Sequence, residues 1–354
     1  MYIHSCLEFT FYLVLLECNV NALIGNKNVL IKRNFTELVS CKYFVDKTLF
    51  IKDFLEEVNY GVKTMTAPAG FGKSTLVDML KTFLSNKHNA TGAQTDYRSN
   101  PSYDVFCKEP LNICKHNEDF VQQHMGQYPV IHIRFSLMGD VFGLESLVDG
   151  MKDVIKASYD EHRYLLQDDV VWPASKLDKL GFVKRLMGDR ALQESEVMDG
   201  WALLAETLHG YFAKKVIILL DDYEAQFGDL ALRDGNKGII ISFVKGLYDN
   251  LFKQNTNLDK ALITGEYIPE EFEVLPKLCM AHHVFLQDHV FAKYFGFNEE
   301  EINEIVVKNI KGEVERNETM EALKAYYDGD MVLGSNIKMY NCYSVVNYLL
   351  NENT

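Results

Sequence analysis

The sequence predicts an α/β fold in three layers, with a mostly parallel sheet between helices on both faces. Two observations predict it. Short apolar segments alternate with longer amphipathic ones, and most of the short segments end in a polar residue or a glycine. The chain has 354 residues, of which 47% are hydrophobic and 24% charged. That is enough material for one large domain or two of ordinary size.

Five short apolar segments are expected to be strands. A strand with helices on both of its faces is apolar throughout and does not alternate with polar residues, and these segments have that character. The expected strands are residues 62–66, 130–135, 216–220, 261–264 and 284–286.

Longer segments with apolar residues at helical spacing are expected to be helices. One has a recognisable start, because Asn298 can cap it and Glu301 follows three residues later, as in a capping box. A mostly helical insertion is expected at about residues 138–213, between two strands. The clearest helical segments are residues 76–84, 144–159, 201–212, 239–252 and 299–310.

Residues 86–115 are polar and are expected to form an irregular surface excursion. Cys107 and Cys114 lie in it, close enough in sequence for a local disulfide. Separate buried thiols are an equally good interpretation of this pair. No cysteine spacing in the chain indicates a zinc site.

The segment TMTAPAGFGKST, residues 64–75, predicts a phosphate-binding loop. Such a loop needs a tight turn whose N–H groups converge on phosphate oxygens, a lysine for the phosphate charge, and a hydroxyl for Mg²⁺. Gly70 and Gly72 supply the turn, Lys73 the ammonium and Ser74 the hydroxyl. An apolar strand precedes the loop and an amphipathic helix follows it. The expected nucleotide-binding residues are Ala67, Pro68, Ala69, Gly70, Phe71, Gly72, Lys73, Ser74 and Thr75.

Ala67 stands where this loop usually has its first glycine. An alanine is tolerated there if the residue keeps a negative φ, because the Cβ atom clashes only in the left-handed region. The close packing of the loop falls to Gly70 and Gly72, and both are present.

A second apolar strand ends in acidic residues, as such a site requires. The sequence KVIILL leads into Asp221-Asp222-Tyr223-Glu224. A carboxylate at the end of a strand can hold Mg²⁺ and another can orient an attacking water. Asp221 is the candidate metal ligand, together with Ser74, and Asp222 or Glu224 is the candidate for the water.

A third strand, LITGE at residues 262–266, ends in polar groups at the same edge of the sheet. Thr264 is a candidate contact for the γ-phosphate or the water. A plain turn after a strand would explain it equally well.

These motifs together resemble the AAA-ATPase-like family, a divergent branch of the P-loop NTPases. The resemblance runs from Tyr43 almost to the end of the chain and implies ATP and Mg²⁺ as ligands. The blocks that carry it are YFVDKTLFIKDFLEE (43–57), APAGFGKSTLVDMLKTF (67–83), PVIHIRFS (129–136), LLDDYE (219–224), LITGE (262–266), YFGFNEEEINEI (294–305), LKAYYDGD (323–330) and MYNCYSVVNYL (339–349).

The chain also departs from that family. Asp222 stands where the family usually has Glu, so hydrolysis is expected to be slow. Many members of the family carry a nuclease-like domain downstream, for which we expect no counterpart here. The expected domains are a core at residues 23–290 and a helical region at 291–354.

The N-terminus resembles a signal peptide with cleavage after Ala22. A buried N-terminal helix or strand is the alternative. Similar short family members occur among secreted proteins of arthropods, which favours secretion. N-glycans are then expected at Asn34, Asn89 and Asn317, each in an N-x-[ST] sequon.

The formal net charge of −14 argues against nucleic acid or an anionic membrane as a partner. Two functional hypotheses remain. The first is a secreted ATP-binding protein with weak Mg²⁺-dependent ATP hydrolysis. The second is a secreted interaction protein, acting on an unknown protein partner, whose nucleotide site does not hydrolyse ATP or is vestigial.

Overall fold

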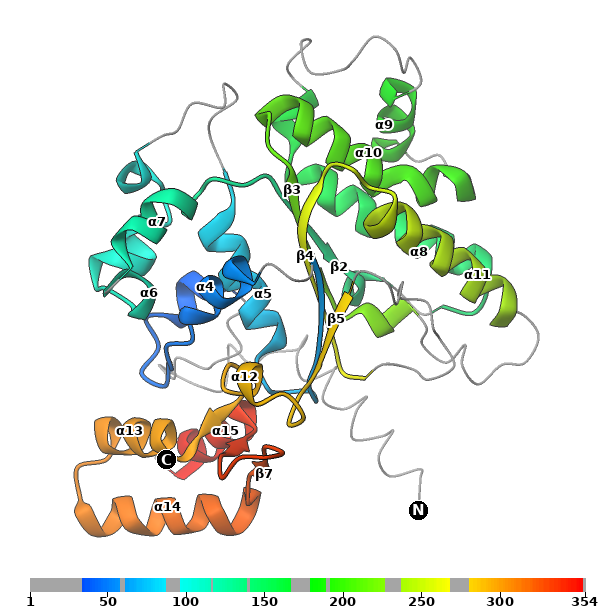
Figure 1. Ribbon diagram of the computed structural model, residues 1–354. Coiled ribbons are helices and arrows are strands. Elements are labelled where there is room, and N and C mark those ends of the chain that lie inside the picture. Colours follow the sequence, from blue (N-terminus) through cyan, green and yellow to red (C-terminus); the bar gives the residue numbers. More distant parts are fainter. Residues whose placement is uncertain are drawn as a thin grey trace.

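The computed structural model describes residues 34–57, 61–86, 96–115, 117–138, 141–166, 179–188, 192–226, 237–267 and 280–352. In Figure 1 a sheet is seen nearly edge-on between two groups of helices, and the last helices gather below it. This is the expected three-layer α/β arrangement of a P-loop NTPase-like fold. None of the helices in the described residues is both long and apolar enough to cross a membrane.

The central sheet has five parallel strands in the order β2-β3-β4-β1-β5. In β3, Ile218 and Leu220 pack on one face of the sheet while Ile217 and Leu219 pack on the other. Both faces are covered, which is why the strand is apolar throughout. The strands are β1 (Val62–Thr66), β2 (Val130–Arg134), β3 (Val216–Asp221), β4 (Leu258–Gly265) and β5 (Met280–Val284).

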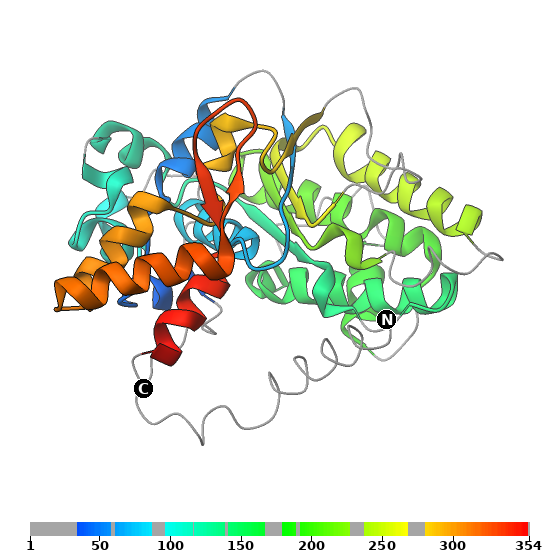
Figure 2. The same ribbon diagram turned by 90° about the horizontal axis from the view of Figure 1, so that it is seen from below.

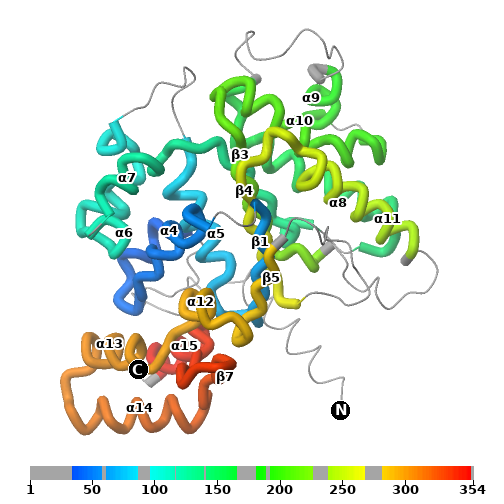
Figure 3. Tube along the Cα trace, viewed as in Figure 1, coloured from blue at the N-terminus to red at the C-terminus, as the bar shows by residue number. Residues whose placement is uncertain are grey.

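One face of the sheet is covered by the helices that follow the phosphate loop and flank it in the sequence (Figure 3). The central one places Leu76, Leu80 and Leu84 in the core, at the spacing of one helical face. This layer consists of α3 (Phe35–Leu38), α4 (Leu49–Glu56), α5 (Lys73–Leu84), α6 (Asn112–Lys115) and α7 (Glu118–His124).

The other face is covered by the insertion between β2 and β3 and by the helix after β3. Trp201 is buried at its centre, with its ring edge-on to Phe135. The described part of the insertion is mostly helical, as expected. The helices are α8 (Leu144–Asp160), α9 (Lys179–Met187), α10 (Glu194–Phe212) and α11 (Lys237–Tyr248), and the last continues into a π-helical turn at Asp249–Lys253.

The C-terminal region forms its own small core around a three-stranded sheet in the order β6-β8-β7. Tyr43, from the start of the described chain, is buried in this core. Figure 2 shows α14 and α15 side by side. The region contains α12 (His289–Ala292), β6 (Phe297–Asn298), α13 (Glu299–Asn309), α14 (Glu313–Tyr327), β7 (Asp330–Met331), β8 (Lys338–Tyr340) and α15 (Cys342–Glu352).

The capping box of α13 forms as expected. The Asn298 side chain accepts a hydrogen bond from the Glu301 N–H at 2.9 Å, and the Glu301 carboxylate accepts one from the Asn298 N–H at 2.8 Å. The acidic first turn of this helix therefore has a structural explanation.

Two expectations about the chain path were wrong. The strand expected at residues 284–286 lies at Met280–Val284, because Leu286 takes a left-handed φ of 69° that ends the strand. The described part of the excursion at 86–115 is no irregular surface loop. It forms short helices and buries Tyr97, Phe106 and Ile113 against the core.

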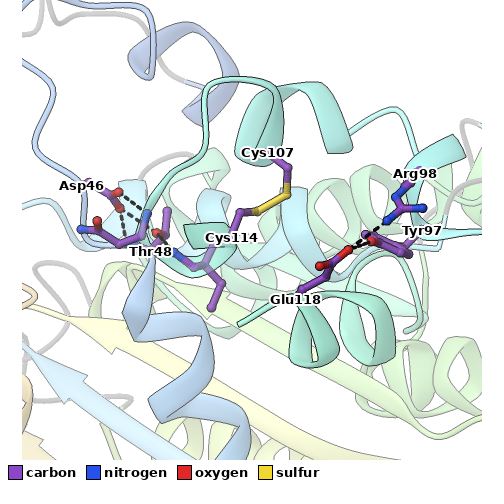
Figure 4. Close-up of a disulfide and its surroundings, with 9 residues drawn as sticks. Asp46, Thr48, Tyr97, Arg98, Cys107, Cys114 and Glu118 are labelled. Atoms are coloured by element: carbon purple, nitrogen blue, oxygen red, sulfur yellow. Dashed lines mark hydrogen bonds and ion pairs between the residues drawn. A yellow bond between two sulfur atoms is a disulfide. The ribbon is translucent and has the colours of Figure 1, made fainter. Parts of the chain in front are cut away.

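Of the two interpretations of Cys107 and Cys114, the structure has the disulfide (Figure 4). The segment is also attached to the chain before α4. The Asp46 carboxylate accepts a hydrogen bond from the Asn112 N–H, and the Thr48 hydroxyl accepts one from the Ile113 N–H. Of the other cysteines, neither Cys41 nor Cys342 is in a disulfide, and Cys279 lies outside the described residues.

Candidate functional site

The phosphate loop has the shape that its sequence predicts. Gly70 and Gly72 take φ angles of 80° and 87°, which only glycine adopts without strain. Ala67 is not among the described residues with positive φ, and its N–H donates to the Gly265 carbonyl at 3.0 Å, next to the β1–β4 pairing. An alanine therefore fits where a glycine is usual.

Lys73 lies at the first position of α5, under the loop. Its side chain is buried, and its ammonium donates to the Ala67 carbonyl at 2.7 Å and to the Pro68 carbonyl at 3.1 Å. A helix N-terminus carries a partial positive charge, and the ammonium adds to it. This end of the loop therefore has the charge and donors that bind an anion.

The remaining loop residues differ in exposure. Pro68, Ala69 and Ser74 are exposed, whereas Phe71 is buried with its ring centroid 4.6 Å from that of Phe285. Thr75 is half-buried on α5. The Ser74 hydroxyl is thus accessible to a ligand, and Phe71 attaches the loop to the protein core.

The acidic edge of the site, defined as Asp221, Asp222 and Glu224, lies at the C-terminal end of β3. Asp221 is buried and accepts a hydrogen bond from the Thr264 hydroxyl at 2.5 Å. The strand order explains this contact, because β4 lies between β3 and the phosphate-loop strand β1. The structure thus brings Thr264 to the candidate metal ligand.

Asp222 and Glu224 point to different sides of β3. Asp222 takes a φ of 56° and is hydrogen-bonded to Ser136, which follows β2. Glu224 accepts from the Glu266 N–H at 2.9 Å, and its other oxygen lies against Gly265 at the end of β4. Since β4 separates β3 from β1, Glu224 is on the side of the phosphate loop.

Both of these carboxyl groups are harder to ionise than usual. Burial, and then the charge of Asp221, raise the pKa of Asp222 to about 6. Burial raises the pKa of Glu224 to about 7, and Asp222 adds to the effect. Lys73 opposes both shifts, so its ammonium is within electrostatic range of both carboxyl groups.

The donor set fits Mg²⁺ bound together with a polyphosphate. Among the described residues, no three His, Cys, Asp or Glu side chains are arranged to hold a metal. Mg²⁺ commonly uses one or two protein ligands and takes the rest from phosphate and water. The Ser74 hydroxyl and the Asp221 carboxylate would supply that part.

A cavity of about 230 Å³ adjoins the phosphate loop. The loop and α5 form one wall, and the segment before α4 and the C-terminal region form the others. Most of its lining is aromatic or aliphatic. The residues that line it include Phe44, Val45, Gly72, Thr75, Met79 and Tyr294.

Several site residues were not predicted from the sequence. Ser136 and Glu266 follow β2 and β4 and contact the acidic edge. Their position after parallel strands was a usable signal, because such ends meet at one edge of a sheet. Lys47 pairs with Glu301 at 2.6 Å and joins the segment before α4 to the C-terminal region. No local pattern predicts that contact.

The comparisons with known proteins agree with this geometry. A family model described as "Predicted AAA-ATPase" matches residues 32–267, which is more than half of the chain. The chain therefore belongs to the AAA-ATPase-like family. Among curated proteins, none matches it.

Proposed function

We propose that this protein binds ATP at the phosphate loop and hydrolyses it slowly with Mg²⁺. The position of Lys73 carries the proposal. Its ammonium is buried at the start of α5, on a glycine-rich turn, and within electrostatic range of the acidic edge. A lysine so placed neutralises phosphate charge next to the groups that would act on it.

The cavity beside the loop supports a nucleotide rather than a simple polyphosphate as the ligand. A purine is flat and apolar on its faces, and the cavity offers aromatic and aliphatic walls directly beside the turn. We place the base there, between Met79 of α5 and the segment that contains Phe44 and Val45.

The residues of the acidic edge, together with Ser74 and Thr264, have different roles in hydrolysis. Ser74 and Asp221 hold Mg²⁺, which neutralises charge that develops on the phosphates. Glu224 positions the attacking water, because it lies on the side of β3 that faces the loop. Thr264 orients Asp221, and Asp222 contributes mainly its charge.

The raised pKa of Glu224, about 7, leaves only about half of this carboxyl ionised at neutral pH, which lowers turnover about twofold there. A protonated carboxyl accepts no proton from water, so only the ionised fraction is active. This agrees with Asp222 standing where related proteins usually have Glu.

The second candidate function is a protein that binds nucleotide without hydrolysing it, or binds none, and acts through a protein partner. The observation that favours it is the network of the acidic edge. Asp221, Asp222 and Glu224 each already have a hydrogen-bond partner within the protein. These contacts hold the carboxyl groups in place without a ligand, although the second oxygen of Glu224 is buried and has no hydrogen-bond partner.

Secretion remains part of the proposal. The Cys107–Cys114 disulfide supports it, since disulfides persist in oxidising compartments. Asn34 and Asn317 are exposed, whereas Asn89 and the expected signal peptide at 1–22 lie outside the described residues. Intact mass and N-terminal sequencing of protein secreted by eukaryotic cells should give a chain that starts at residue 23 and carries N-glycans. A chain that stays inside the cell contradicts secretion.

Calorimetric titration of MgATP into wild type and Lys73→Ala tests the central proposal. We expect saturable binding that weakens about 100-fold or more in the variant, because a charge-assisted contact is lost. Lys81→Ala is the matched control, since Lys81 lies on the same helix but pairs with Glu161 at 2.6 Å. Equal binding by wild type and Lys73→Ala, or none by wild type, contradicts an ATP site at this loop.

A further inference from the structure

The outer rim of the phosphate loop is hydrogen-bonded along its whole length. The carbonyl groups of five successive residues each accept at least one hydrogen bond. Lys73 donates to the first two, and the C-terminal region donates to the other three. The pairs are Lys73 Nζ to Ala67 O and Pro68 O, Asn341 Nδ2 to Ala69 O at 2.8 Å, Cys342 Sγ to Gly70 O at 2.9 Å, Tyr343 N to Gly70 O at 3.2 Å, and Gly296 N to Phe71 O at 2.9 Å.

We call Gly296 together with residues 341–343 the clasp. Its two parts are distant in sequence but rigidly joined, because Phe297 of β6 pairs with Tyr340 of β8. One part precedes β6 and the other begins α15. The phosphate loop is thus held by the small C-terminal sheet and the helix that follows it.

The clasp fits closely against the loop at two glycines. A Cβ atom at Gly70 would lie 2.6 Å from the Asn341 side chain. A Cβ atom at Gly296 would lie 2.4 Å from the Tyr340 carbonyl and 2.8 Å from the Phe71 ring. Contacts this close leave the loop little room to change shape while the clasp is in place.

The thiol of the clasp can act as a hydrogen-bond donor. Burial raises the pKa of Cys342 to about 11, so the thiol keeps its proton at neutral pH. Asn341 is the stronger partner, because an amide N–H donates better than a thiol.

Holding the carbonyl groups also fixes the N–H groups of the same loop. A peptide unit is planar, so a carbonyl held on the outer side of a turn sets the direction of the N–H next to it. Donors that are held in place before a ligand arrives bind an anion more tightly than donors that must be ordered on binding.

We propose that Asn341 is a positioning residue of the nucleotide site, through which the C-terminal region sets the affinity of the phosphate loop for polyphosphate. This inference rests on the proposed function, since it concerns the same loop. It assigns the C-terminal region a role in nucleotide binding, because displacing the start of α15 would remove the contact of Asn341 with the loop.

Asn341 allows the clasp contact to be separated from helix capping. Its Oδ1 accepts a hydrogen bond from the Ser344 N–H at 3.1 Å, at the start of α15, while its Nδ2 makes the contact with the loop. Serine and aspartate are both good N-cap residues. Asn341→Ser is too short to reach the loop while it caps, and Asn341→Asp has no donor.

The matched controls are Asn298→Ser and Asn298→Asp. Asn298 caps α13 in the same region through the Glu301 N–H. The controls repeat the chemical changes at another N-cap. Any effect of a weaker cap on the C-terminal region as a whole should therefore appear in them too. Asn341→Ser adds no charge, so it separates loss of the contact from repulsion between a new carboxylate and the bound phosphate.

The experiment measures dissociation constants for MgATP and for inorganic tripolyphosphate, with thermal melting of every variant. We expect both Asn341 variants to bind each ligand about 10-fold more weakly than wild type, as loss of one hydrogen bond implies. The Asn298 variants should match wild type, and all melting temperatures should agree closely.

Three outcomes overturn the proposal. If wild type binds ATP and both Asn341 variants bind it equally well, the proposed function is supported but the proposed role of Asn341 is wrong. Weaker binding of ATP but not of tripolyphosphate means that Asn341 acts through the cavity and not through the loop. An equal loss of affinity in the Asn298 variants means that the substitutions act by destabilising the C-terminal region as a whole. Absence of ATP binding by wild type overturns the proposed function itself.

Discussion

The phosphate loop and the acidic edge are stabilised in different ways. The carbonyl groups of the loop accept hydrogen bonds from Lys73, at the start of α5, and from the clasp. The carboxyl groups of the acidic edge are held by neighbours within the edge of the sheet. Burial keeps two of these groups hard to ionise. The difference teaches that two parts of one site can be held in place independently, and the proposed function assigns binding to the first part and hydrolysis to the second.

The largest expected effect is a loss of ATP hydrolysis, without a loss of ATP binding, when Asp221 is replaced. Asp221→Asn should lower ATP turnover about 100- to 1,000-fold, because one fixed charge at the reacting phosphates is lost. Affinity for ATP without Mg²⁺ should change little. Steady-state phosphate release and titration would measure the two effects. The control is Asp199→Asn. Asp199 is an exposed residue of α10 that contacts Asn250, in the helix layer on the opposite face of the sheet from α5.

If Asp221→Asn keeps wild-type turnover, Asp221 has no part in the reaction and does not hold Mg²⁺. The comparison between the two parts of the site then loses its basis.

The next prediction distinguishes the roles of Asp222 and Glu224, the two carboxyl groups whose pKa is raised. Glu224→Gln should lower turnover about 100-fold, as expected for loss of a general base. The amide keeps the contact with the Glu266 N–H. Asp222→Asn should lower turnover by about 10-fold or less, because Asp222 points toward Ser136. A larger loss in Asp222→Asn than in Glu224→Gln would reverse these roles.

A third change tests a segment far from the reaction. Joint replacement Cys107→Ser and Cys114→Ser should lower the free energy of unfolding by about 2 kcal/mol, from the lost closure of a short loop. The hydrogen bonds of Asp46 and Thr48 to the segment should keep it folded (Figure 4). Chemical denaturation measures stability, and titration should give unchanged ATP affinity. Weakened ATP binding would show that this segment supports the site.

The smallest effect is on stability and depends on pH. The folded pKa of Glu224 is raised, so folding favours the protonated form and wild type loses stability as pH rises from about 4.5 to about 7. Glu224→Gln lacks this loss. Since the group is partly exposed, we expect a gain on the order of 1 kcal/mol at pH 8. Near pH 4 the variant and wild type should be equal. A variant less stable than wild type at pH 8 contradicts the raised pKa.

Much of the fold could be predicted from local sequence. Strands buried on both faces are continuously apolar, and four of the five were expected close to their observed positions. The fifth, β5, contains His282 and His283 and lies at the edge of the sheet, so no apolar run marks it. The buried aromatic residues of the excursion, such as Phe106, were missed because their apolar runs are short; that of Phe106 is only Val105-Phe106-Cys107, between polar segments.

In the candidate site, too, some features could be predicted from local sequence and others could not. The loop and the acidic residues after β3 have local signatures, which come from the chemistry of phosphate and Mg²⁺. The left-handed φ of Asp222 has no signature, although Asp tolerates that region better than most residues do. The contact of Asn341 with Ala69 joins positions 272 residues apart, and only the folded structure reveals it.

The most direct test of the account measures binding and turnover on one wild-type preparation at pH 6 and pH 8. With the pKa of Glu224 at about 7, turnover should rise about 10-fold between these values while the ATP dissociation constant changes less than about 3-fold. That result would support an ATP affinity that is set by the phosphate loop and a rate of hydrolysis that is limited by the ionised fraction of Glu224. Turnover equally fast at both pH values, or absence of saturable ATP binding, would contradict it.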